Sequence, residues 1–310
     1  MYDLIVVGGG PAGLTATVYA IRKRLNVLMI SRDLGGKTNY RLALPWIEDY
    51  QVIRGLETVA KFKHELEYLD YARSMDKVEK VQPVDHHFVL QMKNSEPVET
   101  KAVIIATGAR QQRLKVPGED KFMMRGLCYS ALSYAPLFID KVVTVIGDAD
   151  LALRSAAELA TVASHVNLVG PSERALQNDL GHKLLAAEHV RVLQDYELVE
   201  VLGDKFAESA VVKGPDGSQE TLVSDGMFIE KALRPTTEMV AGLVNLDIQG
   251  RIIIDCQNRT NVPGIFAAGD VQDHVYRQAI TSAGTGCMAA LDAQRFLEQA
   301  SGHEIPRTPG

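Results

Sequence analysis

Two stretches of the chain share the same order of apolar and polar positions. In each, a short apolar run predicts a buried strand, and a turn containing glycine or alanine follows it. A segment with helical periodicity comes next, and a second apolar run predicts another strand. The first stretch covers residues 3–30 and the second covers residues 141–169. Because this order is typical of doubly wound α/β folds, the pattern predicts two Rossmann-like domains with parallel sheets.

The first of these turns has the composition of a dinucleotide-binding loop. Residues 8–13 read Gly-Gly-Gly-Pro-Ala-Gly, which is G-x-G-x-x-G between a predicted strand and a predicted helix. The first glycine permits the tight turn, the second lets a pyrophosphate approach the backbone, and the third lets the helix pack on the strand. The helix N-terminus then offers free N–H groups to an anion. We therefore predict dinucleotide contacts at Gly8, Gly10, Pro11, Ala12 and Gly13.

The residues after the second predicted strand depart from the usual pattern. An acidic residue is expected there to bind a ribose hydroxyl, but Ser31 and Arg32 occupy the place. Taken alone, Arg32 indicates a 2′-phosphate and hence NADP, or else a plain turn at the strand end. The C-terminal motif described below favours FAD, so we interpret Ser31 and Arg32 as contacts on the adenosine side.

The second turn keeps the fold pattern but changes its chemistry. It reads G-x-A-x-x-A from Gly147, where Ala149 adds a methyl group and Asp148 adds a negative charge. Both changes act against a bound pyrophosphate, and no cluster of basic residues for a 2′-phosphate follows the next strand. The sequence therefore disfavours NADPH in this domain.

Composition and charge exclude several classes of protein. The 310 residues include 33 Lys and Arg against 39 Asp and Glu, a mild acidity that argues against a nucleic-acid-binding protein. No apolar run reaches the roughly 18–20 residues of a membrane span, and Met1 leads into a strand without a signal-peptide pattern. Three cysteines are too few for a disulfide framework, and no histidine spacing suggests a metal site. We expect a cytoplasmic protein.

Three further segments carry a resemblance to a known family. They are VIIATGARQQRLKVPGED at 103–120, the long segment 260–297 beginning TNVPGIFAAGD, and WIEDYQVIRGLETVAKFKHEL at 46–66. Together with the N-terminal turn, they resemble the low-molecular-weight, bacterial-type thioredoxin reductases over the whole chain. The resemblance implies an FAD domain formed by residues 1–112 and 243–310, an inserted domain at 113–242, and a homodimer.

The resemblance also implies a set of cofactor contacts. It places a loop beside the flavin, an adenine contact made by backbone, a turn that follows the cofactor, a carboxylate on the ribityl chain, and a helix start at the isoalloxazine ring. Lys37 replaces a family glutamine in that loop, and Asp49, after a loop about three residues longer than usual, replaces a common asparagine. The implied contacts are Gly36, Lys37, Thr38, Asn39, Asp49, Val78, Ala106, Thr107, Gly108, Gly269, Asp270, Arg277, Gln278 and Ala279.

The catalytic dithiol of the family is missing. Its Cys-x-x-Cys falls on Ser130 and Ser133, and the neighbouring aspartate falls on Tyr134. A serine hydroxyl has no redox couple, so this pair cannot pass electrons to thioredoxin. Cys128 is nearby and has no cysteine partner within three residues, so it is either a buried small side chain or a lone thiol that forms mixed disulfides. Ser130, Ser133, Tyr134 and Cys128 remain candidates beside the flavin.

Three functions are compatible with this pattern. The first is a flavin-dependent oxidoreductase whose electrons come from a ferredoxin-like protein, a free flavin or a second bound flavin, with the vacated NADPH and dithiol space open to a planar ligand. The second is a non-catalytic FAD protein that senses redox state or binds a partner. The third is a weak NAD(P)H oxidase.

Overall fold

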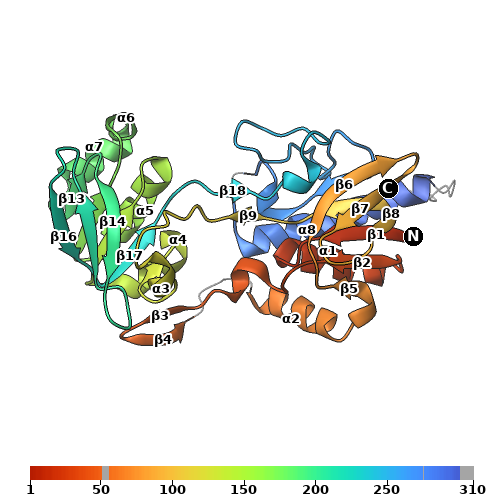
Figure 1. Cartoon of the computed structure of the whole chain (residues 1–310), viewed down its shortest axis with the longest axis horizontal. Coiled ribbons are helices and arrows are strands. Elements are labelled where there is room, and N and C mark those ends of the chain that lie inside the picture. The colour runs from red at the N-terminus through yellow and green to blue at the C-terminus, as the bar shows by residue number, and fades with distance from the viewer. Residues whose placement is uncertain (51–55, 275, 301–310) are drawn as a thin grey trace, which may run out of the picture. The chain divides into compact units, whose positions relative to one another are not determined.

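The computed structural model describes residues 1–50, 56–274 and 276–300, which form two compact units (Figure 1). The first unit comprises Met1–Asn39, Ile53–Arg110 and Arg234–Gly310, and the second comprises Tyr40–Val52 and Gln111–Leu233. These bounds differ from the sequence-based ones because residues 40–52 belong to the second unit and residues 234–242 belong to the first.

The first unit is built on a largely parallel sheet with the strand order β5-β2-β1-β8-β7-β6, and β19 also pairs with β8. The central strands β1, β2, β8 and β19 run parallel, whereas β6 and β7 form an antiparallel extension of β8. The strands are β1 (Tyr2–Val7), β2 (Val27–Ile30), β5 (Arg73–Ser74), β6 (Val78–Val84), β7 (His87–Met92), β8 (Val98–Ile105) and β19 (Ile265–Ala267).

Side chains of β1 alternate between two cores. Leu4 and Val6 pack on one face of the sheet, and Ile5 and Val7 pack on the other, as the period of two in a strand requires. Helices α1 (Pro11–Arg22) and α8 (Ala279–Ala300) share the core of Leu4 and Val6 and lie side by side (Figure 1). Their backbones touch, because a Cβ on Gly286 would lie 2.2 Å from the carbonyl oxygen of Ala12. Helix α2 (Leu56–Glu67) completes this side.

Short elements complete the first unit. The two-stranded pair β9 (Ala109–Arg110) and β18 (Arg234–Pro235) explains why residues 234–242 belong here, since β18 pairs with β9 inside the first unit. The 3-10 helices are η1 (Gly36–Asn39), η2 (Asp70–Ala72), η4 (Glu238–Val240) and η5 (Gly269–Val271).

The second unit contains a fully parallel sheet with the order β10-β17-β11-β12-β13 and a separate antiparallel sheet β14-β15-β16. The parallel strands are β10 (Leu127–Cys128), β11 (Val142–Ile146), β12 (His165–Val169), β13 (Val190–Leu193) and β17 (Gly226–Ile229). The antiparallel strands are β14 (Glu197–Leu202), β15 (Ser209–Lys213) and β16 (Gln219–Val223). The helices are α3 (Glu119–Phe122), α4 (Ala131–Tyr134), η3 (Ala135–Phe138), α5 (Asp150–Ala160), α6 (Glu173–Leu176) and α7 (Asp179–Ala186).

The two predicted α/β repeats are confirmed, with shifted helix boundaries. Helix α1 starts at Pro11 rather than at residue 14, and α5 starts at Asp150 rather than at residue 153. In both cases the helix begins inside the segment that the sequence assigned to the turn. Pro at the first helical position suits the fixed φ of proline, and no described helix is long and apolar enough to cross a membrane.

A hairpin of β3 (Leu42–Leu44) and β4 (Ile47–Tyr50) explains the position of residues 40–52. Leu42 and Leu44 are fully buried in the core of the second unit. The indole N–H of Trp46 donates to the carbonyl of Leu137 at 3.2 Å, and its ring meets Phe138 edge to face at 5.8 Å. The sequence-predicted extra length of this loop therefore forms a strand pair whose apolar side chains complete the second core.

Trp46 is the single tryptophan of the chain, and its removal tests this packing. We expect Trp46→Ala to destabilise the second unit by about 2 kcal/mol, since a half-buried indole loses its packing and its hydrogen bond. Trp46→Phe keeps the aromatic contact and should lose less. Urea unfolding followed by circular dichroism measures both, and equal stability of Trp46→Ala and the natural chain would contradict the role of the hairpin.

Candidate cofactor site

The glycine turn of the first unit combines close packing with one open position. Gly8 has φ +116°, and a Cβ there would lie 2.3 Å from the carbonyl oxygen of Ala106 at the end of β8. A Cβ on Gly13 would lie 1.8 Å from the oxygen of Gly8. A Cβ on Gly10, in contrast, would meet no atom within 4 Å. Gly8 and Gly13 are thus required for packing, whereas Gly10 borders free space.

Helix α1 points its N-terminus at this space. Gly10 is the extended N-cap residue, Pro11 is at the first helical position, and no side chain caps the helix or adds an acidic group to its first turn. The first N–H groups of the helix lack intrahelical partners, and the helix dipole adds partial positive charge at the same end. This geometry suits a phosphate or pyrophosphate.

The loop at η1 and the turn at η5 meet beside the glycine turn. Lys37 Nζ contacts Asp270 Oδ2 at 2.9 Å, and the hydroxyl of Ser282 donates to the other carboxylate oxygen of Asp270 at 3.3 Å. A Cβ on Gly36 would lie 3.2 Å from Cα of Gly10, so the loop runs directly against the turn. The structure therefore brings together the predicted residues from positions 8–13, 36–39 and 269–270.

Arg277 supplies an unsatisfied polar group near the start of α8. Its Nε–H is buried and has no hydrogen-bond partner among the described residues. Burial lowers the pKa of Arg277, while the Asp270 carboxylate acts in the opposite direction. Because a buried donor without a partner is costly, an acceptor from a bound ligand would satisfy it. Helix α8 begins at Ala279, as predicted.

The other predicted contacts of the first unit lie at the carboxyl ends of β2 and β8 or in the segments beside them. The hydroxyl of Thr107 donates to the carbonyl of Thr236, and Gly108 has φ +67° with no atom within 4 Å of a Cβ. Side chains of the η1 loop fold back on their own turn, with Thr38 donating to Gly35 and Asn39 donating to Leu34. The remaining predicted residues here are Ser31, Arg32, Val78, Ala106, Gly269 and Gln278.

Asp49 is the one predicted cofactor residue that falls in the second unit. It lies in β4, and its side chain is outside the described part of the structure. Its proposed contact with the flavin stays a prediction.

Comparisons with known proteins agree with this geometry. A family model described as pyridine nucleotide-disulphide oxidoreductase matches residues 2–286. The chain belongs to this family. It is 33% identical over 299 residues to an alkyl hydroperoxide reductase of Staphylococcus aureus strain MSSA476 (its F subunit), an alignment that covers 96% of this chain and 59% of that one. The chain thus spans about three fifths of the length of this relative.

Solved structures similar to this family member include two thioredoxin reductases. The enzyme from Streptococcus pyogenes is 32% identical with a TM-score of 0.85, over 96% of this chain and 99% of that one. The enzyme from Giardia duodenalis is 28% identical with a TM-score of 0.83, over 96% and 98% of the two chains. The predicted thioredoxin reductase-like α/β fold and the class of flavin-dependent oxidoreductase are confirmed, and the family binds FAD.

The cradle of the first unit fits that cofactor. The open space at Gly10 and the free N-terminus of α1 would hold the pyrophosphate, and Asp270 would meet the ribityl chain. Arg277 would satisfy its buried Nε–H on an acceptor of the flavin ring system. When bound, FAD supplies the electron-accepting ring of this family. The protein contributes the binding, the orientation and the charges around the ring.

In the second unit, the two serines at the former dithiol face each other. Ser130 Oγ and Ser133 Oγ are 2.9 Å apart across the first turn of α4. Cys128 behind them is fully buried, and burial raises the pKa of its thiol well above its ordinary value. Tyr134 is also buried, which raises its pKa to about 12. The structure thus supports the interpretation of Cys128 and Tyr134 as core side chains rather than as reactive groups.

Two charged residues after β17 were not predicted as site residues. Glu230 is 4% exposed, and its carboxylate accepts the backbone N–H of Ala131 at 2.7 Å, directly behind the serine pair. Lys231 contacts Asp148 of the altered turn at 2.8 Å. The sequence analysis assigned no role to Glu230 and left Lys231 outside the predicted site. The structure pairs Lys231 with the carboxylate that the turn introduces.

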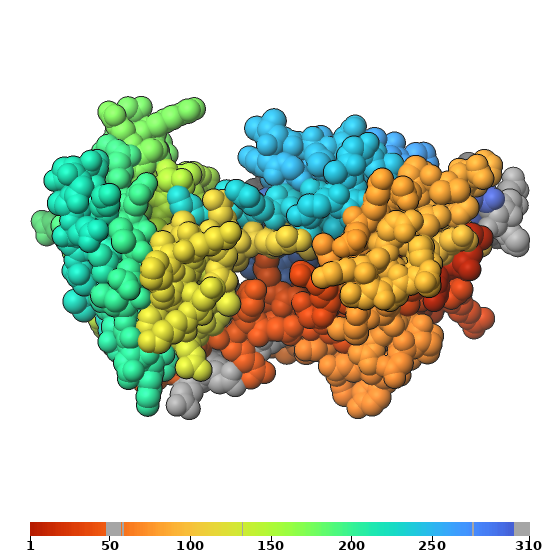
Figure 2. Space-filling view, in the orientation of Figure 1, coloured from red at the N-terminus to blue at the C-terminus, as the bar shows by residue number. Residues whose placement is uncertain are grey.

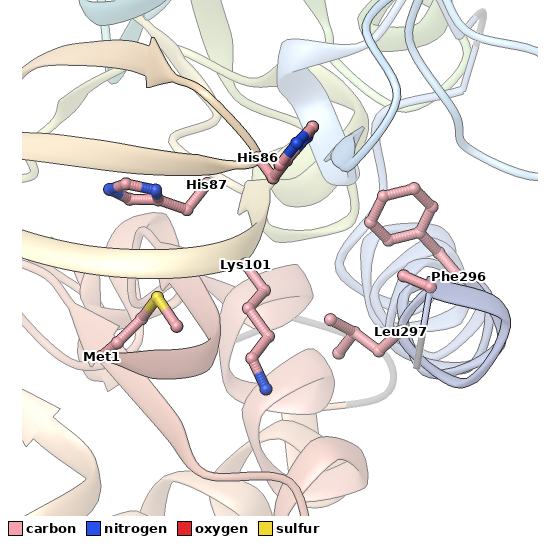
Figure 3. Close-up of a pocket in the computed structure, with 7 residues that line it drawn as sticks. Met1, His86, His87, Lys101, Phe296 and Leu297 are labelled. Carbon is pink, nitrogen blue, oxygen red and sulfur yellow. The ribbon is translucent and has the colours of Figure 1, made fainter. Parts of the chain in front are cut away.

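A separate, mostly apolar hollow of about 320 Å³ lies at the end of α8 and is shown in Figure 3. His86 and His87 reach it from the β6–β7 turn, and their imidazoles point in different directions. No group of three metal-ligating side chains occurs among the described residues. The hollow is lined by none of the predicted cofactor residues.

Two glycine substitutions separate packing from ligand binding. We expect Gly10→Ala to fold with unchanged stability but to lose at least tenfold in FAD affinity, because its methyl group fills the open space. Gly13→Ala should fail to fold normally, because its methyl group overlaps Gly8. Flavin retention and thermal unfolding measure both effects, with Gly284→Ala, which also meets no atom within 4 Å, as the control. Full flavin retention by Gly10→Ala would contradict the assignment.

Glu230 makes stability depend on pH. Burial raises the pKa of Glu230 above 4.5, against the hydrogen bonds from Ala131 and Ser155. The folded chain then binds more protons than the unfolded chain between 4.5 and the raised value, so stability falls as pH rises through this window. We expect Glu230→Gln to remove this part of the decline in thermal unfolding profiles. The exposed Glu188→Gln serves as control, and parallel profiles for all three proteins would refute the assignment.

Proposed function

We propose that this chain is an FAD-dependent oxidoreductase that receives electrons from a donor other than NADPH and delivers them without a dithiol. The observation that carries the proposal is the Ser130–Ser133 pair, which has the spacing of the family's Cys-x-x-Cys. Two hydroxyl groups at 2.9 Å form a hydrogen bond but cannot form a reversible disulfide. Electrons on the flavin therefore leave by direct reaction with an acceptor.

The altered turn of the second unit supports the same proposal. A dinucleotide pyrophosphate needs free N–H groups and no nearby negative charge. Here Asp148 enters the turn, and Lys231, with a side chain only 20% exposed, is held on that carboxylate. The lysine is engaged inside the protein, and Ala149 adds a methyl group at the second position of the motif. These residues act together against NADPH.

The proposal extends to the donor and the assembly. A ferredoxin-like protein, a free flavin or a second flavin bound in the vacated space would supply electrons without using the pyridine-nucleotide motif. We also propose a homodimer and a cytoplasmic location, in keeping with the resemblance to thioredoxin reductases. The acceptor is a compound that reacts with reduced flavin itself.

Anaerobic mixing tests the choice of donor. We expect NADPH and NADH to leave the visible flavin absorption unchanged over many seconds, whereas dithionite bleaches it. A variant with Asp148→Gly, Ala149→Gly and Lys231→Ala, which restores a plain glycine turn, should respond faster to NADPH than the natural chain does. Rapid bleaching of the natural chain by NADPH would overturn the proposal, and a bleached flavin that no acceptor reoxidises would favour a redox sensor.

Thiol titration tests the geometry of the serine pair. The natural chain has three cysteines, and the variant with Ser130→Cys and Ser133→Cys has 3 + 2 = 5. We expect the new pair to form a disulfide, so that the oxidised, denatured variant titrates three thiols and the reduced variant titrates five. Ser133→Cys alone should titrate four in both states. Five free thiols in the oxidised double variant would contradict the alignment with the family dithiol.

A further inference from the structure

A second concave site lies in the first unit and is strongly basic. It is a cavity of about 350 Å³ lined by residues of four loops and turns. Figure 2 shows the orange segment around β6 and β7, which carries part of this lining, on the surface of the first unit. The lining residues are Arg32, Met75, Asp76, Lys77, Lys93, Asn94 and Arg110. Four cationic side chains thus surround a single carboxylate.

That carboxylate is occupied by hydrogen bonds from its own loops. Asp76 accepts the backbone N–H of Lys77 at 2.7 Å and the hydroxyl of Ser95 at 2.7 Å. It also accepts the backbone N–H of Asn94 at 3.2 Å and the side-chain amide of Asn94 at 2.9 Å. These bonds lower the pKa of Asp76, with the Ser95 hydroxyl as the largest contributor. Asp76 therefore ties two loops together and forms no ion pair with the surrounding cations in the described part of the chain.

The cations themselves lack partners. Arg32, Lys77 and Lys93 form no ion pair within 4.0 Å in the part of the chain that the structure describes, and Arg110 contacts Glu238 only at 3.5 Å on an exposed surface. The whole chain carries a formal net charge of −6. A concave cluster of unpaired positive charge on an acidic protein concentrates anions locally.

The position of the cavity separates it from the pyrophosphate site. Arg32 follows the carboxyl end of β2 by two residues, and Arg110 is the last residue of β9. The phosphates of FAD would lie at Gly10 and the N-terminus of α1, and neither Gly10 nor a residue of α1 lines the cavity. FAD carries no other phosphate, so the four charges exceed what that cofactor requires.

We propose that this cavity binds a phosphate-bearing small molecule about the size of a mononucleotide, in addition to FAD. The volume lies at the lower end of the range for small-molecule sites. Arginine and lysine are the side chains that bind phosphate by charge-assisted hydrogen bonds. The proposal depends on the FAD cradle of the first unit but not on the identity of the electron donor.

Titration calorimetry on the FAD-loaded protein tests this site with inorganic phosphate, ADP and adenosine. We expect phosphate and ADP to bind, with an affinity that falls as salt rises, and adenosine not to bind. Lys77→Gln with Lys93→Gln should weaken ADP binding at least tenfold. The matched control is Lys61→Gln with Lys80→Gln, two exposed lysines outside the lining, and it should leave ADP binding unchanged.

Several outcomes would overturn the proposal. They are no binding of phosphate or ADP, equal ADP affinity in both double variants, and binding of a polyglutamate peptide without binding of ADP. Loss of FAD from the Lys77 and Lys93 variant would also overturn it, because the cavity would then serve the cofactor's own adenosine. The flavin spectrum of each sample shows whether the cradle is filled, so failure of this site is distinguishable from failure of the proposed function.

Discussion

Backbone contact between the end of β8, the glycine turn and α1 is the constraint on which the first unit depends. Gly8 sits against Ala106, and Gly13 sits against Gly8, at separations that leave no room for a side-chain carbon. These contacts aim the N-terminus of α1 along the carboxyl edge of the sheet. They also leave Gly10 as the one position of the motif that borders open space. The helix dipole, the η1 loop and Asp270 all converge there.

The second unit shows what happens when the same turn keeps its shape but changes its charge. Gly147 is still tightly packed, with a Cβ position 2.5 Å from the carbonyl oxygen of Glu230. At the neighbouring position, however, the ion pair between Asp148 and Lys231 replaces an uncharged turn. The parallel sheet and the start of α5 survive this change because they depend on backbone and apolar packing. A phosphate site does not, because it depends on local charge.

Sequence reasoning identified features that depend on local pattern. Apolar runs separated by a glycine turn predicted β1, α1 and β2, and Asp270 was placed at the cofactor by its motif. Features that depend on long-range packing were missed. The destination of Trp46 is set by Leu137 and Phe138, some ninety residues away along the chain, and no periodicity in a three-residue strand reveals it. The contacts of Glu230 and Lys231 likewise join segments about eighty to a hundred residues apart.

The account separates a preserved flavin cradle from a redox path that has lost its pyridine-nucleotide and dithiol parts. The most direct test is to denature the purified protein and identify the released cofactors by chromatography and mass spectrometry. The account predicts FAD at one or more molecules per chain, since a second flavin is one of the proposed donors, and no bound pyridine nucleotide. A protein that releases NADP(H), or that carries no flavin and cannot be loaded with FAD, would contradict it.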